Sequence, residues 1–355
     1  MQFNKEFVDK QICEQDTDKT TAMSKEVVSF KELANILGVS RTTVSRVLTG
    51  QAQKYRISAK TQARVREAAA HYNVQANQVA KNLKLQKTNT VGLLIPDISN
   101  PFFANLALQV ELALREAGKM LLLCNTNDDT PTEQATLDLL LARQIDGLLV
   151  APVGTEVAHF NAASKRPIIF IDRYFPEHAI PYVATDNKLG AQMATNYILQ
   201  RGHQQIVCIQ GLPHTTSNQQ RVLGFQEAMQ QAGHSPAPIS GNEFSISNGY
   251  QSFQQLLQRN VEFTAVFALS SQIAIGVLEA AKEAGLRVPD DFSLISFDEQ
   301  PYLKLTDPAI TTIQQPIETI GQRATAMLLE LIEGQSVDSQ LFPPTLIERS
   351  SVASI

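Results

Sequence analysis

Short apolar runs alternate with helical segments along most of the chain, beginning at Thr90. Eight runs follow one another: TVGLLIP, KMLLLCN, DGLLVAP, PIIFID, YVATDN, IVCIQG, AVFAL and FSLISFD. The stretches between most of them have helical patterning, as at 102–117 and 131–143. Continuous apolar strands that alternate with helices predict an α/β fold with parallel sheets. Residues 89–350 are many for one sheet, so we expect two lobes that face each other across a cleft.

The N-terminal part of the chain has helical spacing instead of apolar runs. Ser29 and Glu32 form the signature of a capping box at the start of a first helix. Gly38 ends this helix, and Ser40 is placed to cap a second one over 41–48. Two helices joined by a tight turn that contains glycine predict a helix-turn-helix unit.

The second of these helices has the polar side chains that a DNA-reading helix needs. Six residues at its start and along it can reach base edges or phosphates: Ser40, Arg41, Thr42, Thr43, Ser45 and Arg46. Arginine can donate two hydrogen bonds at once to the O6 and N7 atoms of guanine. Threonine can hydrogen-bond a base or contact the thymine methyl group. Val44, Val47 and Leu48 are expected to hold the helix to the rest of the head. The alternative is a small three-helix bundle whose charges only face water.

A third helix is indicated from Ser58 onwards, so we expect a helix-turn-helix DNA-binding domain over 24–74. Residues 75–88 follow as a hinge helix and linker, which is too short to be stable alone and suited to folding on DNA. Residues 1–23 are expected to be a disordered extension or a mis-assigned start. In the second case Met23 is the true initiator.

The charge distribution supports DNA binding by the head. The net charge of the chain is −5, but residues 24–88 contain twelve Lys/Arg and only three Asp/Glu. A compact basic segment on an acidic body is typical of a nucleic-acid-binding head.

Composition excludes several other classes of protein. No apolar run approaches the roughly 18 residues that a membrane helix needs, so we expect no membrane partner. The polar, acidic start lacks the apolar core of a signal peptide, which favours a cytoplasmic protein. Cys13, Cys124 and Cys208 are far apart and odd in number, so neither a disulfide framework nor a cysteine-rich metal site is expected. We find no nucleophile elbow, P-loop or dinucleotide fingerprint, and expect neither an enzyme nor a cofactor or metal.

Polar and aromatic side chains follow the predicted strands. In open α/β sheets ligands bind outside the carboxyl ends of the strands, so these positions are the candidates for a binding site. They are Asp97, Asn100, Phe102, Phe103, Asp172, Arg173, Asp186, Asn187, His214, Ser217, Arg221, Ser270, Ser271, Asp298 and Glu299. Carboxylates, arginines, hydroxyls and aromatic rings together suit a sugar.

Several of these residues also have a purely structural interpretation. Asp186 and Asn187 are suited to capping the helix that follows them. Asn100 precedes a proline and is typical of a turn. Glu299 is expected to be solvated, and Arg173 can pair with a surface carboxylate. The two phenylalanines, 102 and 103, can pack in the core.

Two stretches resemble the LacI/GalR family of bacterial transcription regulators. The first stretch is FKELANILGVSRTTVSRVLTG. The second is ISAKTQARVREAAAHYNVQANQVAKNLKLQKTNTVGLLIPDISNPFF, which runs from the third helix of the head into the first strand of the body. The insertion GQAQKYRIS resembles the fructose-type and sucrose-type repressors of that family. The resemblance implies a body like the periplasmic sugar-binding proteins and a homodimer. It places Arg41, Thr42 and Arg46 at base-reading positions and Leu83 at the hinge position that enters the minor groove. The family usually has proline where this chain has Ala76.

The resemblance also implies which residues face the effector. It places seven residues in the effector cleft: Phe102, Phe103, Asp172, Arg221, Phe244, Asp298 and Gln315. The family often has Asn-Asp where this chain has Ser270-Ser271. Loss of that carboxylate, together with Arg173 and Arg221, leads to the hypothesis that the cleft admits a sugar phosphate.

These observations together predict a homodimeric repressor that binds a palindromic operator in double-stranded DNA and is controlled by a sugar or sugar-phosphate effector. A purine or other non-sugar effector is the alternative within this class. A stand-alone sugar-binding protein, or an enzyme that uses Asp172 and Asp298, are the alternatives outside it.

Overall fold

The computed structural model describes residues 28–72, 74, 88–163, 166–234 and 238–355. The chain divides into two compact units, Met1–Lys84 and Leu85–Ile355, and each is described separately. The expected N-terminal extension, most of the expected hinge and Leu83 lie outside the described residues. Within them, no helix is long and apolar enough to cross a lipid bilayer.

The first unit contains three helices, α1 (Phe30–Leu37), α2 (Arg41–Leu48) and α3 (Ala59–His71). Ser29 and Glu32 form the predicted capping box, with the Ser29 amide donating to the Glu32 carboxylate at 2.7 Å. Ser40 and Ser58 cap the other two helices by accepting from backbone amides three residues later. A small core that includes Leu33, Val44, Val47 and Val65 joins the helices.

Gly38 makes the tight turn between α1 and α2. Its φ of 64° lies in the left-handed region, which glycine adopts without the steric cost of a Cβ. The Gly38 amide donates to the α1 carbonyls, and Ser40 then begins α2. The helix-turn-helix geometry therefore follows from local residue chemistry at two adjacent positions.

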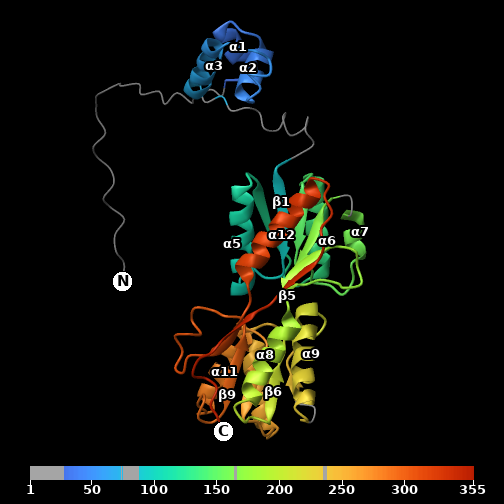
Figure 1. The fold of residues 1–355 in the computed structure, drawn as a ribbon, viewed down its shortest axis with the longest axis vertical. Helices are drawn as coiled ribbons and strands as arrows, with labels where there is room; N and C mark the ends of the chain where they lie inside the picture. Colours follow the sequence, from blue (N-terminus) through green and yellow to red (C-terminus); the bar gives the residue numbers. More distant parts are fainter. Residues whose placement is uncertain (1–27, 73, 75–87, 164–165, 235–237) are drawn as a thin grey trace, which may run out of the picture. The chain divides into compact units, whose positions relative to one another are not determined.

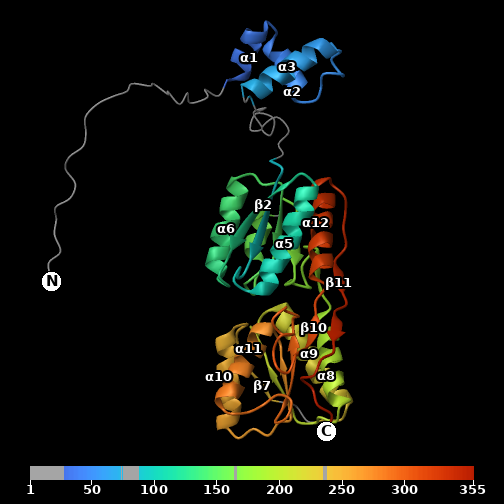
Figure 2. The same ribbon diagram turned by 90° about the vertical axis from the view of Figure 1, so that its left-hand side faces the viewer.

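The second unit contains two lobes, each built on a six-stranded sheet (Figure 1). The strands of the first sheet are, in spatial order, β11 (Gln340–Phe342), β5 (Tyr182–Thr185), β4 (Ile168–Ile171), β3 (Gly147–Val150), β1 (Thr90–Ile95) and β2 (Met120–Asn125). All its pairings are parallel. Its helices are α5 (Pro101–Glu116), α6 (Thr130–Ala142), α7 (Ala158–Ala163) and α12 (Ile317–Ile332). They cover both faces, with α5 and α12 on one and α6 on the other (Figure 2).

The second sheet repeats this order with β12 (Thr345–Ile347), β10 (Thr311–Gln314), β9 (Ser293–Phe297), β8 (Ala265–Ala268), β6 (Ile206–Ile209) and β7 (Ile239–Ser240). Its edge strand β12 is antiparallel to β10, whereas the other pairings are parallel. Its helices are α8 (Asn187–Leu199), α9 (Thr216–Gln231), α10 (Ile246–Gln258) and α11 (Ser271–Glu283). Helices α8 and α9 pack on one face, and α10 and α11 on the other.

The chain crosses between the lobes three times, after β5, after β10 and between β11 and β12 (Figure 2). The crossings are bonded to one another. The Thr185 hydroxyl donates to the Gln315 side-chain oxygen at 2.5 Å, and the Asp186 amide donates to the Phe342 carbonyl at 2.8 Å. Three short, mutually bonded connections would restrict the axis of any rotation between the lobes.

The α/β fold class with an all-helical head is confirmed, and each of the eight apolar runs contains a strand. Four strands were not predicted: β7, β10, β11 and β12. They have two to four residues each, and the longest of them, β10, is TTIQ with buried threonines in place of an apolar run. Strands this short and polar do not stand out by periodicity.

Close packing of α10 against α11 leads to a prediction about stability. A Cβ added at Gly276 would lie 2.0 Å from the Ile246 carbonyl oxygen and 2.5 Å from the Tyr250 amide nitrogen. Since these are backbone atoms, the helices must separate. Gly276→Ala should therefore lower the free energy of unfolding by roughly 1–3 kcal/mol or more, measured by urea denaturation. Glu279→Ala, on the exposed side of the same helix, should stay within about 0.5 kcal/mol of wild type. Equal stability of both variants would contradict this packing.

Candidate functional site

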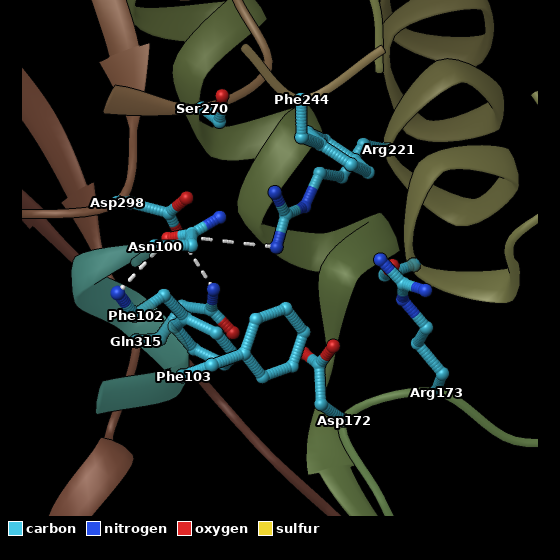
Figure 3. A pocket seen from close by; sticks show the side chains of 11 residues that line it. Asn100, Phe102, Phe103, Asp172, Arg173, Arg221, Phe244, Ser270, Asp298 and Gln315 are labelled. Carbon is cyan, nitrogen blue, oxygen red and sulfur yellow. Dashed lines mark hydrogen bonds and ion pairs between the residues drawn. The ribbon is translucent and has the colours of Figure 1, made fainter. Parts of the chain in front are cut away.

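One cavity lies between the lobes of the body, where the carboxyl ends of the two sheets meet (Figure 3). Eleven residues line it: Asn100, Phe102, Phe103, Asp172, Arg173, Ser217, Arg221, Phe244, Ser270, Asp298 and Gln315. All eleven are among the candidates that the sequence analysis named, either after the predicted strands or from the family resemblance. Their convergence is a property of the structure, and their role in binding stays a prediction.

The two aspartates occupy equivalent places in the two lobes. Asp172 directly follows β4 and Asp298 directly follows β9, which is the corresponding strand of the second sheet. Both residues have a left-handed backbone, with φ of 66° and 70°. This conformation is uncommon outside glycine, although aspartate tolerates it better than most residues. The same local turn in each lobe therefore brings a carboxylate to the cavity.

Asp172 is the charged group of the site with the fewest hydrogen bonds from the described residues. It is 4% exposed, and the described residues give its carboxylate no hydrogen bond. Burial raises the pKa of Asp172 to about 6, although the nearby Arg221 and Arg173 guanidinium groups lower it. A buried carboxylate without hydrogen-bond donors is costly, so the site favours a ligand that supplies them.

Arg221 is held firmly by neutral groups. Its Nε donates to the Asn187 side-chain oxygen at 2.8 Å, and one terminal nitrogen donates to the Leu269 carbonyl at 2.7 Å. The guanidinium carbon lies 3.8 Å from the centre of the Phe297 ring. The other terminal nitrogen is 3.9 Å from a carboxylate oxygen of Asp298, which is too long for a hydrogen bond. Burial lowers the pKa of Arg221, while the two cavity aspartates oppose that change.

Asp298 connects the cavity to the crossings between the lobes. The Gln315 side-chain amide donates to its carboxylate, and the oxygen of the same amide accepts from Thr185. The backbone of Ser271 also contributes a hydrogen bond to Asp298. Burial raises the pKa of Asp298, and Arg221 and these hydrogen bonds lower it. A ligand bound to Asp298 would therefore act on two of the three connections.

Arg173 approaches the cavity from the first lobe. It pairs with Asp128 at 2.6 Å, so the alternative of a pair with a partly exposed carboxylate is confirmed. Its Nε is buried and has no hydrogen-bond partner within the described part of the chain. The guanidinium carbon lies 5.5 Å from the centre of the Phe103 ring. One N–H group of this arginine is thus available to an acceptor on a ligand.

Several cavity residues also have structural roles, of which core packing of Phe102 and Phe103 is the one that the sequence suggested. The Asn100 side chain caps α5 by accepting from the Phe102 amide at 3.0 Å, and Ser270 caps α11 at 3.3 Å. Phe102 and Phe103 belong to the core of the first lobe as well as to the cavity. Ser217 is buried near the start of α9. Structural and binding roles therefore do not exclude each other at these positions.

Other candidates lie outside the cavity. Asp186 caps α8, as its structural interpretation predicted. The expectation that Glu299 is solvated is wrong, because Arg349 grips its carboxylate with two terminal nitrogens at 2.7 and 2.9 Å. The His214 ring nitrogen lies 3.2 Å from the Val153 carbonyl oxygen of the other lobe.

Sequence reasoning assigned Asn187 to capping and did not single out Asp128. Their partners Arg221 and Arg173 are 34 and 45 residues away, so no local pattern indicated these contacts.

The cavity itself is small. It measures about 20 Å³, and about 10–15 Å³ suffice for one water molecule, so it holds about one. A monosaccharide is many times larger. The lobes or the lining side chains must therefore move before an effector of that size can enter.

The head presents its candidate DNA-reading side chains differently. Arg41 and Thr42 are exposed at the start of α2. The Ser40 and Thr43 hydroxyls are 2.9 Å apart and bonded to each other, so both also serve the helix cap. Ser45 and Arg46 are half-buried, and the Arg46 guanidinium lies over the Tyr55 ring.

Metal binding has no support in the described ranges, where no three His, Cys, Asp or Glu side chains form a group that could hold an ion. The ring nitrogens of His203 lie 2.9 Å from the Thr264 hydroxyl and 3.0 Å from the Ala353 carbonyl oxygen, which are contacts of a structural histidine.

Comparison with known proteins gives consistent results for both units. Residues 29–77 match the family described as "Bacterial regulatory proteins, lacI family", and residues 195–352 match "Periplasmic binding protein-like domain". The chain is 32% identical to a ribose operon repressor from Halalkalibacterium halodurans, over 92% of this chain and 97% of the relative. It is 34% identical to the transcriptional repressor PurR of Pectobacterium carotovorum, with the same coverage. The structure of a Lac repressor dimer bound to operator and an anti-inducer covers 92% of this chain with a TM-score of 0.85 and 25% identity.

The raised pKa of Asp172 leads to a prediction about pH. Because its pKa is higher in the folded protein, its contribution to stability is intact below about pH 4 and is lost as pH rises through about 6. Asp172→Asn removes this loss. The variant should gain up to about 3 kcal/mol over wild type at pH 7, and this gain should vanish near pH 4.

Urea unfolding between pH 4 and pH 7 measures the effect. Asp138→Asn, which changes an exposed carboxylate, is the matched control and should follow wild type throughout. A stability gain for Asp172→Asn that does not change with pH would contradict the assignment.

Proposed function

Because the chain belongs to the LacI family of bacterial transcriptional repressors, we propose that its body binds a sugar or sugar-phosphate effector that controls operator binding by the head. The observation that carries this proposal is the cavity, in which two aspartates, two arginines and three phenylalanines converge from both lobes. Charged groups that bond vicinal hydroxyls, next to aromatic faces for C–H groups, suit a polyhydroxylated ligand.

The unmet hydrogen-bonding needs of the cavity favour hydroxyl groups. Among the residues that the structure describes, none donates a hydrogen bond to the Asp172 carboxylate, and none accepts one from the Nε of Arg173. A hydroxyl group donates and accepts at once, so adjacent hydroxyls can serve both residues. A purine would call for stacking and amide-like partners. Gln315 is an amide of the cavity, but its two ends are already bonded to Asp298 and Thr185.

A sugar phosphate is the second candidate for the effector, and Arg173 is the residue that supports it. Its side chain is buried, and its only described carboxylate partner, Asp128, is partly exposed and lies outside the cavity lining. A phosphate group could replace that carboxylate with a bidentate contact of the kind that guanidinium groups favour.

The proposed mechanism is a shift between two arrangements of the lobes. We assign residues 24–74 to DNA binding, 75–88 to a hinge helix and linker, and 89–350 to effector binding and dimerisation. Effector binding rotates the lobes about the three bonded crossings and changes whether the two hinge segments of a dimer, with Leu83, can pair in the minor groove. The size of the response equals the difference in effector affinity between the two arrangements.

A homodimer is part of this proposal. One helix-turn-helix reads one half-site, so a two-fold dimer reads a palindrome. The similar Lac repressor structure is a dimer on its operator. Within α5, the apolar side chain of Leu108 is half exposed, which is consistent with a role for this helix in dimerisation. The operator DNA of a bacterium lies in the cytoplasm, and we place the protein there.

A ligand panel tests the effector class. It contains ribose, fructose, sucrose, glucose, galactose, their phosphates, purines and cytidine. A ligand at about 100 times its Kd should stabilise the folded protein by about 2.7 kcal/mol in thermal unfolding. We expect one sugar or sugar phosphate to do so, and Asp298→Asn to abolish the effect. A response to purines or cytidine alone would contradict the sugar proposal.

Operator titrations with the same ligand then give the direction of control. Weaker DNA binding identifies an inducer, and tighter binding a corepressor. Asp138→Asn should respond as wild type does in both assays, because Asp138 is exposed and does not line the cavity.

The basic head generates a separate prediction. Residues 24–88 have twelve Lys/Arg, and contacts between such residues and phosphates release counterions. Operator affinity should therefore fall by roughly 10³–10⁵-fold between 50 and 200 mM salt if 6–10 phosphates are contacted. Fluorescence anisotropy with labelled operator measures this slope. An affinity that does not change with salt would contradict the assignment of the head.

A further inference from the structure

The segment after the recognition helix α2 is a firm extension of the head. The Gln51 amide donates to the Arg46 carbonyl at 2.8 Å, and the Ile57 amide donates to the Ala52 carbonyl at 3.0 Å. Ala52 is 2% exposed and belongs to the core of the head. Backbone hydrogen bonds and one buried anchor thus hold residues 49–57 in a defined conformation. A side chain from this segment has a defined position relative to α2.

The aromatic ring of Tyr55 is that side chain. The guanidinium carbon of Arg46 lies 3.6 Å from the centre of the ring, within the range of a close cation–π contact. Tyr55 is 42% exposed, so the pair lies at the surface of the head. In the described part of the chain, the Arg46 guanidinium has no hydrogen bond and no ion pair.

We propose that Tyr55 is a positioning residue that holds Arg46 for DNA reading, and that it thereby contributes to operator specificity from outside the recognition helix. This inference rests on the proposed role of Arg46 in reading DNA. A ring against the flat face of the guanidinium leaves its N–H groups free in the plane, where a guanine or a phosphate binds.

The contact acts through conformational entropy and charge. An arginine side chain loses rotamer freedom when it binds DNA, and a ring that holds it beforehand reduces this loss. A carboxylate would also hold the arginine, but it would neutralise the charge and repel phosphates. An aromatic ring avoids both effects, so it suits an arginine that must remain available to DNA.

A double-mutant cycle tests the inference. The probe is the palindromic duplex that the full-length wild-type protein recovers from a random library, and the readout is its Kd by fluorescence anisotropy. We expect Tyr55→Ala to raise the Kd roughly 5–10-fold, whereas Tyr55→Phe, which keeps the ring, stays within about twofold. In an Arg46→Ala background, Tyr55→Ala should change the Kd less than twofold, because the residue through which it acts is gone.

Specificity provides the readout that a merely structural role would not change. Tyr55→Ala should leave the Kd for a random-sequence duplex unchanged, and repeating the library selection with it should relax the preference at one base pair per half-site. Unfolding midpoints of the variants should match wild type, since Tyr55 lies outside the core of the head.

Four outcomes would overturn the inference. Equal effects of Tyr55→Ala with and without Arg46 would show that the two residues act independently. An effect of Tyr55→Phe as large as that of Tyr55→Ala would show that the hydroxyl contacts DNA directly. Equal losses for operator and random duplex would make Tyr55 a general contact. If Arg46→Ala alone leaves operator affinity unchanged, the DNA-reading role of Arg46 fails instead, and the inference fails with it.

Discussion

The burial of four charged side chains between the two lobes is the constraint on which the body depends. Asp172 and Asp298 reach this place from equivalent strands, and both adopt a left-handed backbone to do so. Taking charges out of water is costly unless they are paired and hydrogen-bonded. Arg221 and Arg173 meet part of this requirement, but Asp172 keeps a raised pKa and lacks hydrogen bonds from the described residues. A polar ligand that supplied the missing hydrogen bonds would gain binding energy from this incomplete satisfaction.

The same cluster is hydrogen-bonded to the connections between the two lobes. Asp298 is bonded to Gln315, which is bonded to Thr185, and these two residues lie in two of the three crossings between the lobes. At the start of the body, the Asp146 carboxylate accepts from the backbone amides of 88 and 89 at 2.6 and 2.9 Å. The first lobe therefore grips the chain where it arrives from the head. In the proposed mechanism, movement of that lobe would therefore reach the hinge directly along the chain.

The sequence predicted the parts of this arrangement that depend on local chemistry. Apolar runs identified eight strands, and capping residues identified the helices of the head. The position of a residue after a strand, together with the family resemblance, selected the cavity lining. Partners brought together only by folding remained hidden, as for Asn187, which supports Arg221 across 34 residues of sequence. Glu299 was misjudged for the same reason, because Arg349 lies 50 residues further along the chain. Strand β10 escaped notice because buried threonines, satisfied by hydrogen bonds such as that from Arg349 to Thr311, replace an apolar run.

Arginines in the two units show how the kind of partner determines what a charge can do. Arg46 in the head contacts an aromatic ring, and Arg221 in the body donates to a side-chain amide and a backbone carbonyl. Neutral partners fix the guanidinium group without cancelling its charge. The group can therefore still attract a phosphate or another acceptor on a ligand. Arg323, by contrast, pairs at 2.8 Å with Glu330 of the same helix, α12. It also donates to the side chain of Gln340 in β11. An arginine paired to a carboxylate stabilises a fold, whereas one held by neutral groups keeps its charge for binding. Arg46 and Arg221 meet this criterion, whereas Arg173 would first have to exchange Asp128 for a ligand group.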